Sequence, residues 1–156
     1  MDLPDTIMGA IFFLIIIVPI VLINKGLNKK RNFFIAKLNE FALKENKVIS
    51  EFDSWTDNTI IGISSDNEYI FFLREIDENK TQLKIAVNKI KNCFIKEHKN
   101  DRKTIVSLEL VFELNDRKEN IVLEFFKADA KNFIMGEEMR IAKKWKNKIM
   151  EDYSKT

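Results

Sequence analysis

The sequence predicts an α+β protein. It would consist of an N-terminal transmembrane helix, then a mostly antiparallel β-barrel or sandwich of about seven strands, then a C-terminal capping helix. Three observations support this class. An uncharged apolar run lies near the start, apolar residues alternate along the middle of the chain, and apolar residues return to helical spacing in 137–151.

The apolar run Ile7–Ile23 is 17 residues long and contains Pro19. A membrane span needs roughly 20 apolar residues, with ~17 near the lower limit, and a proline is tolerated there with a kink. A secretory signal peptide is the first alternative, but it requires a basic segment before the run, where this chain has only Asp2 and Asp5. A buried core helix is the second alternative. The run therefore predicts an uncleaved anchor.

A basic cluster follows the run directly: Lys25, Lys29, Lys30 and Arg31. Basic residues flank the cytoplasmic end of a span. The cluster therefore predicts a single-pass protein of the inner (cytoplasmic) membrane, with the N-terminus outside and the C-terminal domain in the cytoplasm. The same four residues are candidates for contact with anionic lipid headgroups, at about 1 kcal/mol per charge. The alternative is that they only set the topology.

Three regions follow from these patterns: an anchor over 1–25, a juxtamembrane amphipathic helix over 26–46, and a β-rich domain over 47–156. Apolar residues at helical spacing mark the second region, namely Phe34, Leu38, Phe41 and Ala42. The third region begins close to the predicted membrane surface, because no Pro- or Ser-rich linker precedes it.

Seven short strands are expected in the third region, separated by turn-forming clusters such as Ser65–Asn67. They span 48–52, 59–64, 68–75, 81–87, 90–98, 104–114 and 120–126. The alternation is cleanest in 104–114. Gly62 lies inside an expected strand, which is typical of a bend or a bulge.

The last expected element is a helix over 137–151, with Glu137 and Glu138 in its first turn. Its apolar stripe consists of Ile141, Ala142, Trp145 and Ile149. We expect this stripe to close one end of the barrel and to bury Trp145.

This layout resembles the pleckstrin-homology-like (PH-like) superfold, through the hairpin TIIGISSDNEYIFFLRE, the helix AKKWKNKI and the order of the elements. It also resembles small bacterial membrane proteins with an N-terminal anchor and a soluble β-rich domain. The PH-like resemblance covers Val48 to about Met150 and implies a binding module for lipid headgroups, peptides or proteins. PH-like proteins that bind phosphoinositides carry Lys and Arg around the first hairpin loop. Here Ser64–Asn67 contains none, so that specificity is not carried over.

No catalytic set is recognisable in the sequence. The four glycines are too scattered for a phosphate-binding loop. Cys93 and His98 are the only residues of their kinds, and alternation places them on opposite faces of one strand. Glu109 and Glu113 share a face that looks solvated. We therefore expect no enzyme activity, no cofactor and no metal site.

Two features are candidates for a partner surface: Phe133 and Met135 before the last helix, and Lys143 and Lys144 on it. The alternatives are that the first pair docks the helix and that the lysines are merely solvated. From Lys25 onward, 26 basic and 22 acidic residues give a net charge of +4, which is mild, whereas a dedicated nucleic-acid binder would show a concentrated basic face.

Together these features predict a non-enzymatic, membrane-tethered interaction module with a protein partner. Two alternatives stay open: an accessory subunit of a larger membrane complex, and a barrel that binds a lipid or small molecule.

Overall fold

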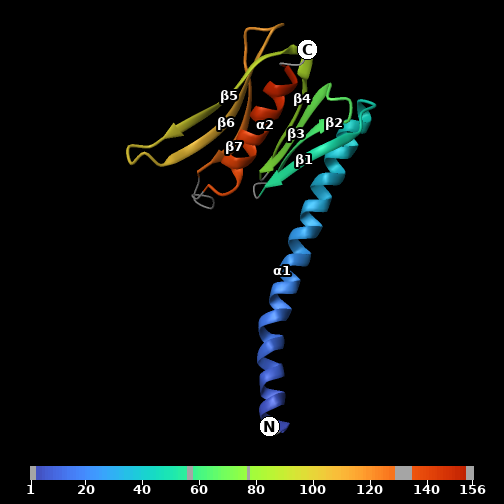
Figure 1. Ribbon diagram of the computed structural model, residues 1–156, viewed down its shortest axis with the longest axis vertical. Helices are drawn as coiled ribbons and strands as arrows, with labels where there is room; N and C mark the ends of the chain where they lie inside the picture. Colours follow the sequence, from blue (N-terminus) through green and yellow to red (C-terminus); the bar gives the residue numbers. More distant parts are fainter. Residues whose placement is uncertain (1–2, 56–57, 77, 129–134, 154–156) are drawn as a thin grey trace. The chain divides into compact units, whose positions relative to one another are not determined.

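The computed structural model describes residues 3–55, 58–76, 78–128 and 135–153 (Figure 1). In chain order its elements are α1 Leu3–Lys44, β1 Ile49–Trp55, β2 Thr59–Ser64, β3 Tyr69–Ile76, β4 Asn79–Ala86, the 3-10 turn η1 Val87–Lys89, β5 Ile90–Lys99, β6 Ile105–Leu114, β7 Ile121–Lys127 and α2 Glu138–Tyr153. The chain divides into two compact units, Met1–Ala36 and Lys37–Thr156, and each is described by itself.

Helix α1 is continuous and includes both Pro19 and Gly26. Nowhere in the described ranges is there a helix long and apolar enough to cross a membrane. The uncharged run Ile7–Ile23 is short for a span. The expected transmembrane helix, and with it the single-pass location in the inner membrane, is therefore wrong.

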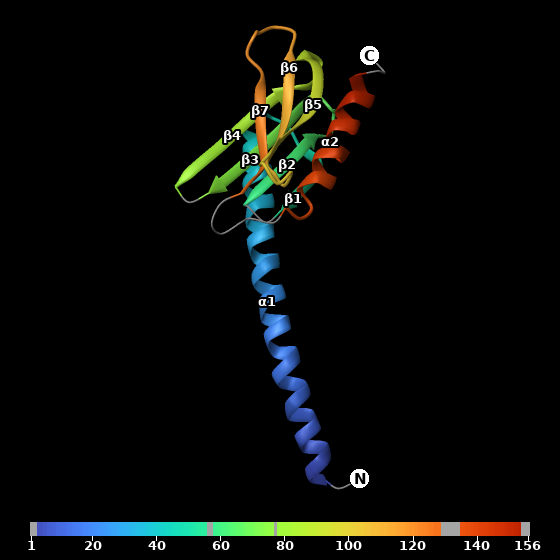
Figure 2. The ribbon, with the colours of Figure 1, turned by 90° about the vertical axis from the view of Figure 1, so that its left-hand side faces the viewer.

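The strands form two separate antiparallel sheets, one of four strands in the order β1-β2-β3-β4 and one of three in the order β5-β6-β7. The two sheets face each other and their strands cross at an angle (Figure 2). The expected fold class, a barrel or sandwich behind a transmembrane helix, is corrected: in the described part of the chain, no ladder joins the two sheets into a closed barrel. The chain leaves β4 through η1 and starts a new sheet at β5, and side chains of β1 engage α2 instead of a further strand.

The core lies between the two sheets and α2. Its largest fully buried side chains are aromatic and come from β3, β6, β7 and α2: Phe72, Phe112, Phe125, Phe126 and Trp145. Phe125 and Phe126 are neighbours, yet both belong to this core. Strand alternation would place only one of them in the core, but the β6–β7 register shifts between Leu108 and Glu109, and such a bulge breaks the period of two.

Helix α2 is fixed beside β1 by polar contacts as well as by its apolar stripe. The indole Nε1 of Trp145 donates a hydrogen bond to Asp53 Oδ2 at 2.9 Å, and Lys144 Nζ lies 2.6 Å from the same oxygen. Lys144 and Lys148 lie 2.9 and 3.1 Å from the carboxylate of Glu51, and their hydrogen bonds lower the pKa of that group. Trp145 is fully buried, as the sequence predicts.

Two side chains of the four-stranded sheet cross to β7 of the other sheet. Arg74 Nη1 donates to the backbone oxygen of Glu124 at 2.9 Å and pairs with its carboxylate at 2.5 Å. Trp55 Nε1 donates to the backbone oxygen of Phe125 at 2.9 Å, and the two rings stack with centroids 4.6 Å apart. These contacts fix the distance between the sheets.

The four-stranded sheet is covered on its other face as well, by the last turns of α1. Leu38 and Ala42 are buried, and the ring of Phe41 packs edge-on against Phe71 with centroids 5.2 Å apart. Gly62 is explained by this layer, because a Cβ on it would lie 2.8 Å from Leu38 Cδ2. The glycine therefore permits the close approach of the helix to the sheet.

Candidate binding site

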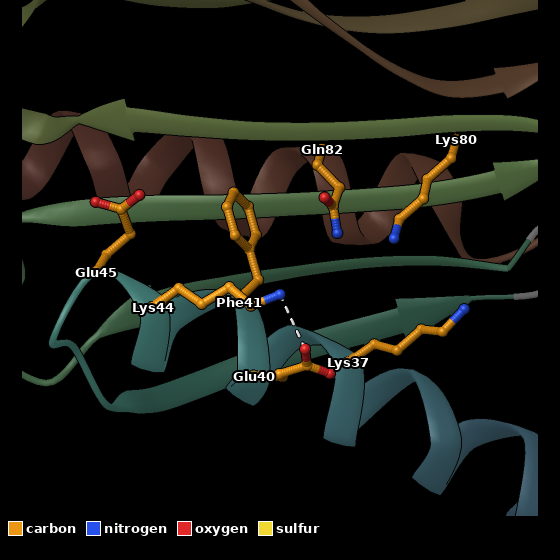
Figure 3. A pocket seen from close by; sticks show the side chains of 7 residues that line it. All are labelled: Lys37, Glu40, Phe41, Lys44, Glu45, Lys80 and Gln82. Carbon is orange, nitrogen blue, oxygen red and sulfur yellow. Dashed lines mark ion pairs between the residues drawn. The ribbon is translucent and has the colours of Figure 1, made fainter.

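A groove of about 230 Å³ lies where the last turns of α1 pass β4 (Figure 3). Its lining, all within Lys37–Thr156, consists of Lys37, Glu40, Phe41, Lys44, Glu45, Lys80 and Gln82. On the helix side, α1 docks through Leu38 and Ala42, and Lys37, Phe41 and Lys44, spaced three or four residues apart, share the neighbouring helix face that lines the groove. The groove is therefore lined by polar side chains and by one aromatic side chain, that of Phe41.

The lysines of the groove differ in how strongly they are engaged. Lys37 Nζ donates to both carboxylate oxygens of Glu75, at 2.7 Å each. Lys44 pairs with Glu40 at 2.9 Å, and this contact lowers the pKa of Glu40. Lys80 lies 3.8 Å from Glu75, beyond hydrogen-bond distance, and half of its side chain is exposed. Lys80 is thus less firmly paired than Lys37 and Lys44.

Strand β4 forms one edge of its sheet, since in the described part of the chain it pairs only with β3. Val87 N donates to the backbone oxygen of Glu68 at 2.8 Å, just beyond the paired residues Tyr69 and Ala86. In an antiparallel ladder, bonded and non-bonded pairs alternate. The N–H and C=O groups of Lys80, Gln82 and Lys84 therefore point away from β3, outward from the edge of the sheet.

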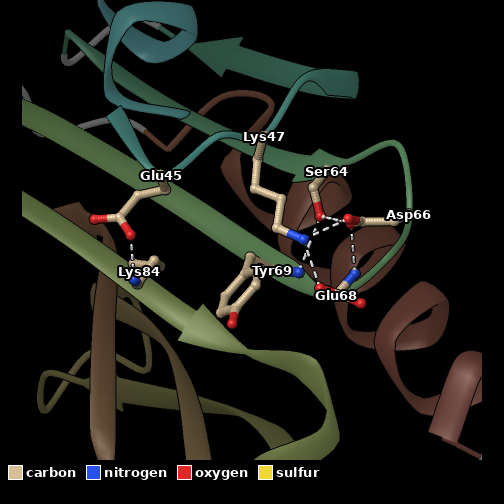
Figure 4. Close-up of polar contacts among 7 residues, drawn as sticks. All are labelled: Glu45, Lys47, Ser64, Asp66, Glu68, Tyr69 and Lys84. Carbon is tan, nitrogen blue, oxygen red and sulfur yellow. Dashed lines mark hydrogen bonds and ion pairs between the residues drawn. The ribbon is translucent and has the colours of Figure 1, made fainter. Parts of the chain in front are cut away.

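The connection that follows α1 is fixed by a polar cluster around Lys47 (Figure 4). Lys47 Nζ donates to Asp66 Oδ2 at 2.6 Å and to Glu68 Oε2 at 2.5 Å, and Ser64 Oγ donates to Asp66 Oδ1 at 2.5 Å. The contact with Asp66, and then that with Glu68, raises the pKa of Lys47, and Lys47 holds the pKa of Asp66 well below its usual range. This cluster ties the end of α1 to the β2–β3 turn.

Tyr69 extends the same cluster toward β4. Lys47 Nζ and Lys84 Nζ lie 5.1 and 5.3 Å from the centre of its ring, within cation–π range. Lys84 also pairs with Glu45 at 2.5 Å. The end of the groove at Glu45 is therefore built from fixed side chains, whereas the end at Lys80 is more open to a new partner.

The residues that the sequence marks as candidates do not form one surface. Lys25, Lys29, Lys30 and Arg31 are exposed on α1 within the unit Met1–Ala36. Phe133 lies outside the described residues.

The other three candidates lie on α2 or just before it, and each has a different environment. Met135 is half-buried and packs against the core. Lys143 is exposed. Lys144 points at β1, where its amine pairs with Glu51 and Asp53. Lys144 is exposed as well, but its amine is engaged by these two carboxylates.

The chemically versatile residues of β5 point apart, as strand alternation predicts. Cys93 is 2% exposed, and burial raises the pKa of its thiol to about 12. His98 is exposed on the opposite face, with Nε2 3.5 Å from Glu109 Oε2 and Ser107 as its register partner. No hydrogen bond between Ser107 and His98 occurs among the described contacts. Within the same residues, His, Cys, Asp and Glu form no group able to hold a metal ion.

The groove was not predicted from the sequence, although one signal for it exists. Strand 79–86 carries polar residues on both faces over Asn79–Gln82, and lysines recur along it at Lys80 and Lys84. Exposure on both faces and repeated lysines are typical of an edge strand.

The fold and the groove define an α+β protein with two antiparallel sheets, in which the edge strand β4 runs beside the groove. Comparison with family models, with curated proteins and with solved structures gave no match to this chain.

Proposed function

We propose that this chain is a non-enzymatic interaction module that binds an extended segment of a partner protein by strand addition to β4. One observation carries the proposal: in the described part of the chain, the backbone groups of Lys80, Gln82 and Lys84 are unpaired along the open edge of the sheet, beside the groove that the side chains of Lys80 and Gln82 line. Strand addition draws its affinity from main-chain hydrogen bonds and its specificity from alternate side chains. The PH-like resemblance stays a prediction beside it.

The surroundings of β4 suit a preformed site. The last turns of α1 form one wall of the groove, here called the helix wall. This wall is held by Leu38 in the apolar layer, by Lys37 on Glu75 and by Lys47 on Asp66. Binding to a wall that is already ordered requires little further loss of conformational entropy. The space between the sheets, by contrast, is filled by side chains such as Trp145 and Phe112, which does not favour a ligand-binding barrel.

A proline at Gln82 tests the proposal directly. Gln82→Pro removes an N–H that points away from β3, so the β3–β4 ladder keeps its bonds while strand addition is blocked. Gln82→Val is the matched control, because it removes the same side chain but keeps the N–H. Both variants should keep the circular dichroism spectrum of the full chain.

The readout is a library of random twelve-residue segments displayed on phage and selected on the immobilised full chain. Enriched segments should bind the Gln82→Val variant at least about as well as the original chain and lose binding to Gln82→Pro. Segments that bind both variants equally would overturn the proposal, and so would a selection without enrichment.

A further inference from the structure

The groove side of β4 indicates what kind of segment it accepts. We infer that this segment is acidic, with a carboxylate facing Lys80 and apolar residues on its opposite face. The inference rests on the proposed strand addition and goes beyond it by naming the chemistry of the partner.

The register of the sheet sets which side chains the added strand meets. Lys80, Gln82 and Lys84 pair with Glu75, Leu73 and Phe71, so the three share the face that α1 covers. A residue of the added strand that lies directly opposite Lys80 has its Cβ about 5 Å away. Opposite charges at such positions stabilise the pairing and like charges destabilise it.

The lysines of the groove leave one opening for a carboxylate. Glu75 already accepts two hydrogen bonds from Lys37, and Lys84 is held by Glu45. Lys80 lies 3.8 Å from Glu75 and is 50% exposed, so its amine can approach a new carboxylate without losing a close pair. The carboxylate of the partner therefore belongs opposite Lys80, and a neutral residue suits the position opposite Gln82.

The other face of the added strand meets different side chains. Leu83 pairs in register with Phe72 and packs against the core while remaining half-buried. An apolar residue beside Leu83 would extend this core to the sheet edge. The preferred segment thus alternates polar or acidic residues with apolar ones.

The same lysines select against wrong partners. Charged side chains on an edge strand disfavour pairing with apolar strands, including the edge of a second copy of this chain. A basic segment would meet Lys80 together with Lys37 and Lys44 of the helix wall. Discrimination thus comes from repulsion as well as attraction.

Three synthetic peptides test the inference on the full chain by fluorescence anisotropy. Each alternates Val with polar positions, and the polar positions carry Glu, Gln or Lys. We expect the Glu peptide to bind about fivefold more tightly than the Gln peptide, in a manner weakened by salt, and the Lys peptide to bind least.

Charge reversal at the groove completes the test. Lys80→Glu should weaken the Glu peptide about tenfold and strengthen the Lys peptide, because one attraction is lost and one repulsion is added. The matched control is Lys99→Glu on β5: its lysine is 51% exposed and also carries an ion pair, and its reversal should change neither affinity.

The outcomes separate the two proposals. If the peptides bind equally regardless of charge and still lose binding in Gln82→Pro, strand addition stands and the acidic preference is overturned. If binding survives in Gln82→Pro, both are overturned. If no peptide binds while the phage selection yields β4-dependent segments, only the acidic preference is overturned.

Discussion

Helix α1 packs closely on the four-stranded sheet where Leu38 lies over Gly62, and replacing Gly62 by Ala should disturb this packing. The added Cβ would lie 2.8 Å from Leu38 Cδ2, 3.1 Å from Ile49 Cγ2 and 3.2 Å from the backbone oxygen of Glu51. The backbone oxygen cannot move aside as a side chain can. Overpacking of this kind costs about 1–3 kcal/mol of unfolding free energy.

A double-mutant cycle with Leu38→Ala isolates the helix contact. Leu38 is 1% exposed, and its truncation alone should cost about 2–5 kcal/mol. In the double variant the closest clash is gone. The losses of unfolding free energy of the two single variants should therefore sum to about 1 kcal/mol more than the loss of the double variant. The remainder of the Gly62→Ala cost should persist, because the contacts with Ile49 and the Glu51 oxygen stay.

Urea unfolding followed by tryptophan fluorescence measures these free energies, since Trp55 and Trp145 both lie in the unit that contains the sheets. Gly136→Ala serves as the control: its Cβ would meet Glu138 Oε2 at 3.5 Å, an ordinary contact, and stability should change by less than about 1 kcal/mol. Additivity of Gly62→Ala and Leu38→Ala within about 0.5 kcal/mol would refute the packing argument.

Three further predictions concern the core and the polar cluster. Trp145→Phe should lower the unfolding free energy by about 1–3 kcal/mol in urea, because Asp53 loses a hydrogen bond of 2.9 Å; equal stability would contradict this role. Burial raises the pKa of Cys93 from 9.0 to about 12. The difference in unfolding free energy between the original chain and Cys93→Ala should therefore be complete below pH 9 and shrink as the pH rises toward 12. A difference that stays constant with pH would contradict this prediction. Lys47 holds the pKa of Asp66 below 3.8, so the contribution of this pair to stability is present above pH 3.8 and lost as the pH falls. Asp66→Asn should therefore make the free energy of unfolding depend less on pH in the acid range. An unchanged dependence would contradict the role of the cluster.

Local pattern was enough for several elements. The run 59–64 is rich in β-branched residues and is followed by turn residues, and it forms β2 with the expected bounds. Residues 104–114 alternate cleanly and form β6 from Ile105. The stripe around Trp145 predicted α2 and the burial of its indole.

Other features depend on interactions that a local pattern does not contain. Phe125 and Phe126 both reach the core because of a bulge, and a bulge is set by the partner strand. Strand β4 begins at Asn79, earlier than its apolar alternation suggests, because its ladder with β3 extends as far as the pair Ile76 and Asn79. The split into two sheets is likewise a matter of which strands pair, with η1 between β4 and β5.

The groove could not be predicted for the same reason. It combines Lys37 and Phe41 with Lys80 and Gln82, which are distant in sequence. The docking of Leu38 over Gly62 helps to bring these segments together, but a glycine inside a strand is equally typical of a bend. Sequence reasoning could identify the edge strand but not the helix that accompanies it.

The apolar layer under α1 decides how this protein can be divided for laboratory work. A fragment that begins at residue 47, where the helical pattern gives way to alternation, would lack Leu38, Phe41 and Ala42. Phe71 and Leu73, both fully buried in the intact chain, would then face water beside the unpaired edge of β4. An exposed apolar face next to an open edge promotes aggregation, so such a fragment should precipitate on expression, whereas one that starts at Lys37 or earlier keeps its own cover.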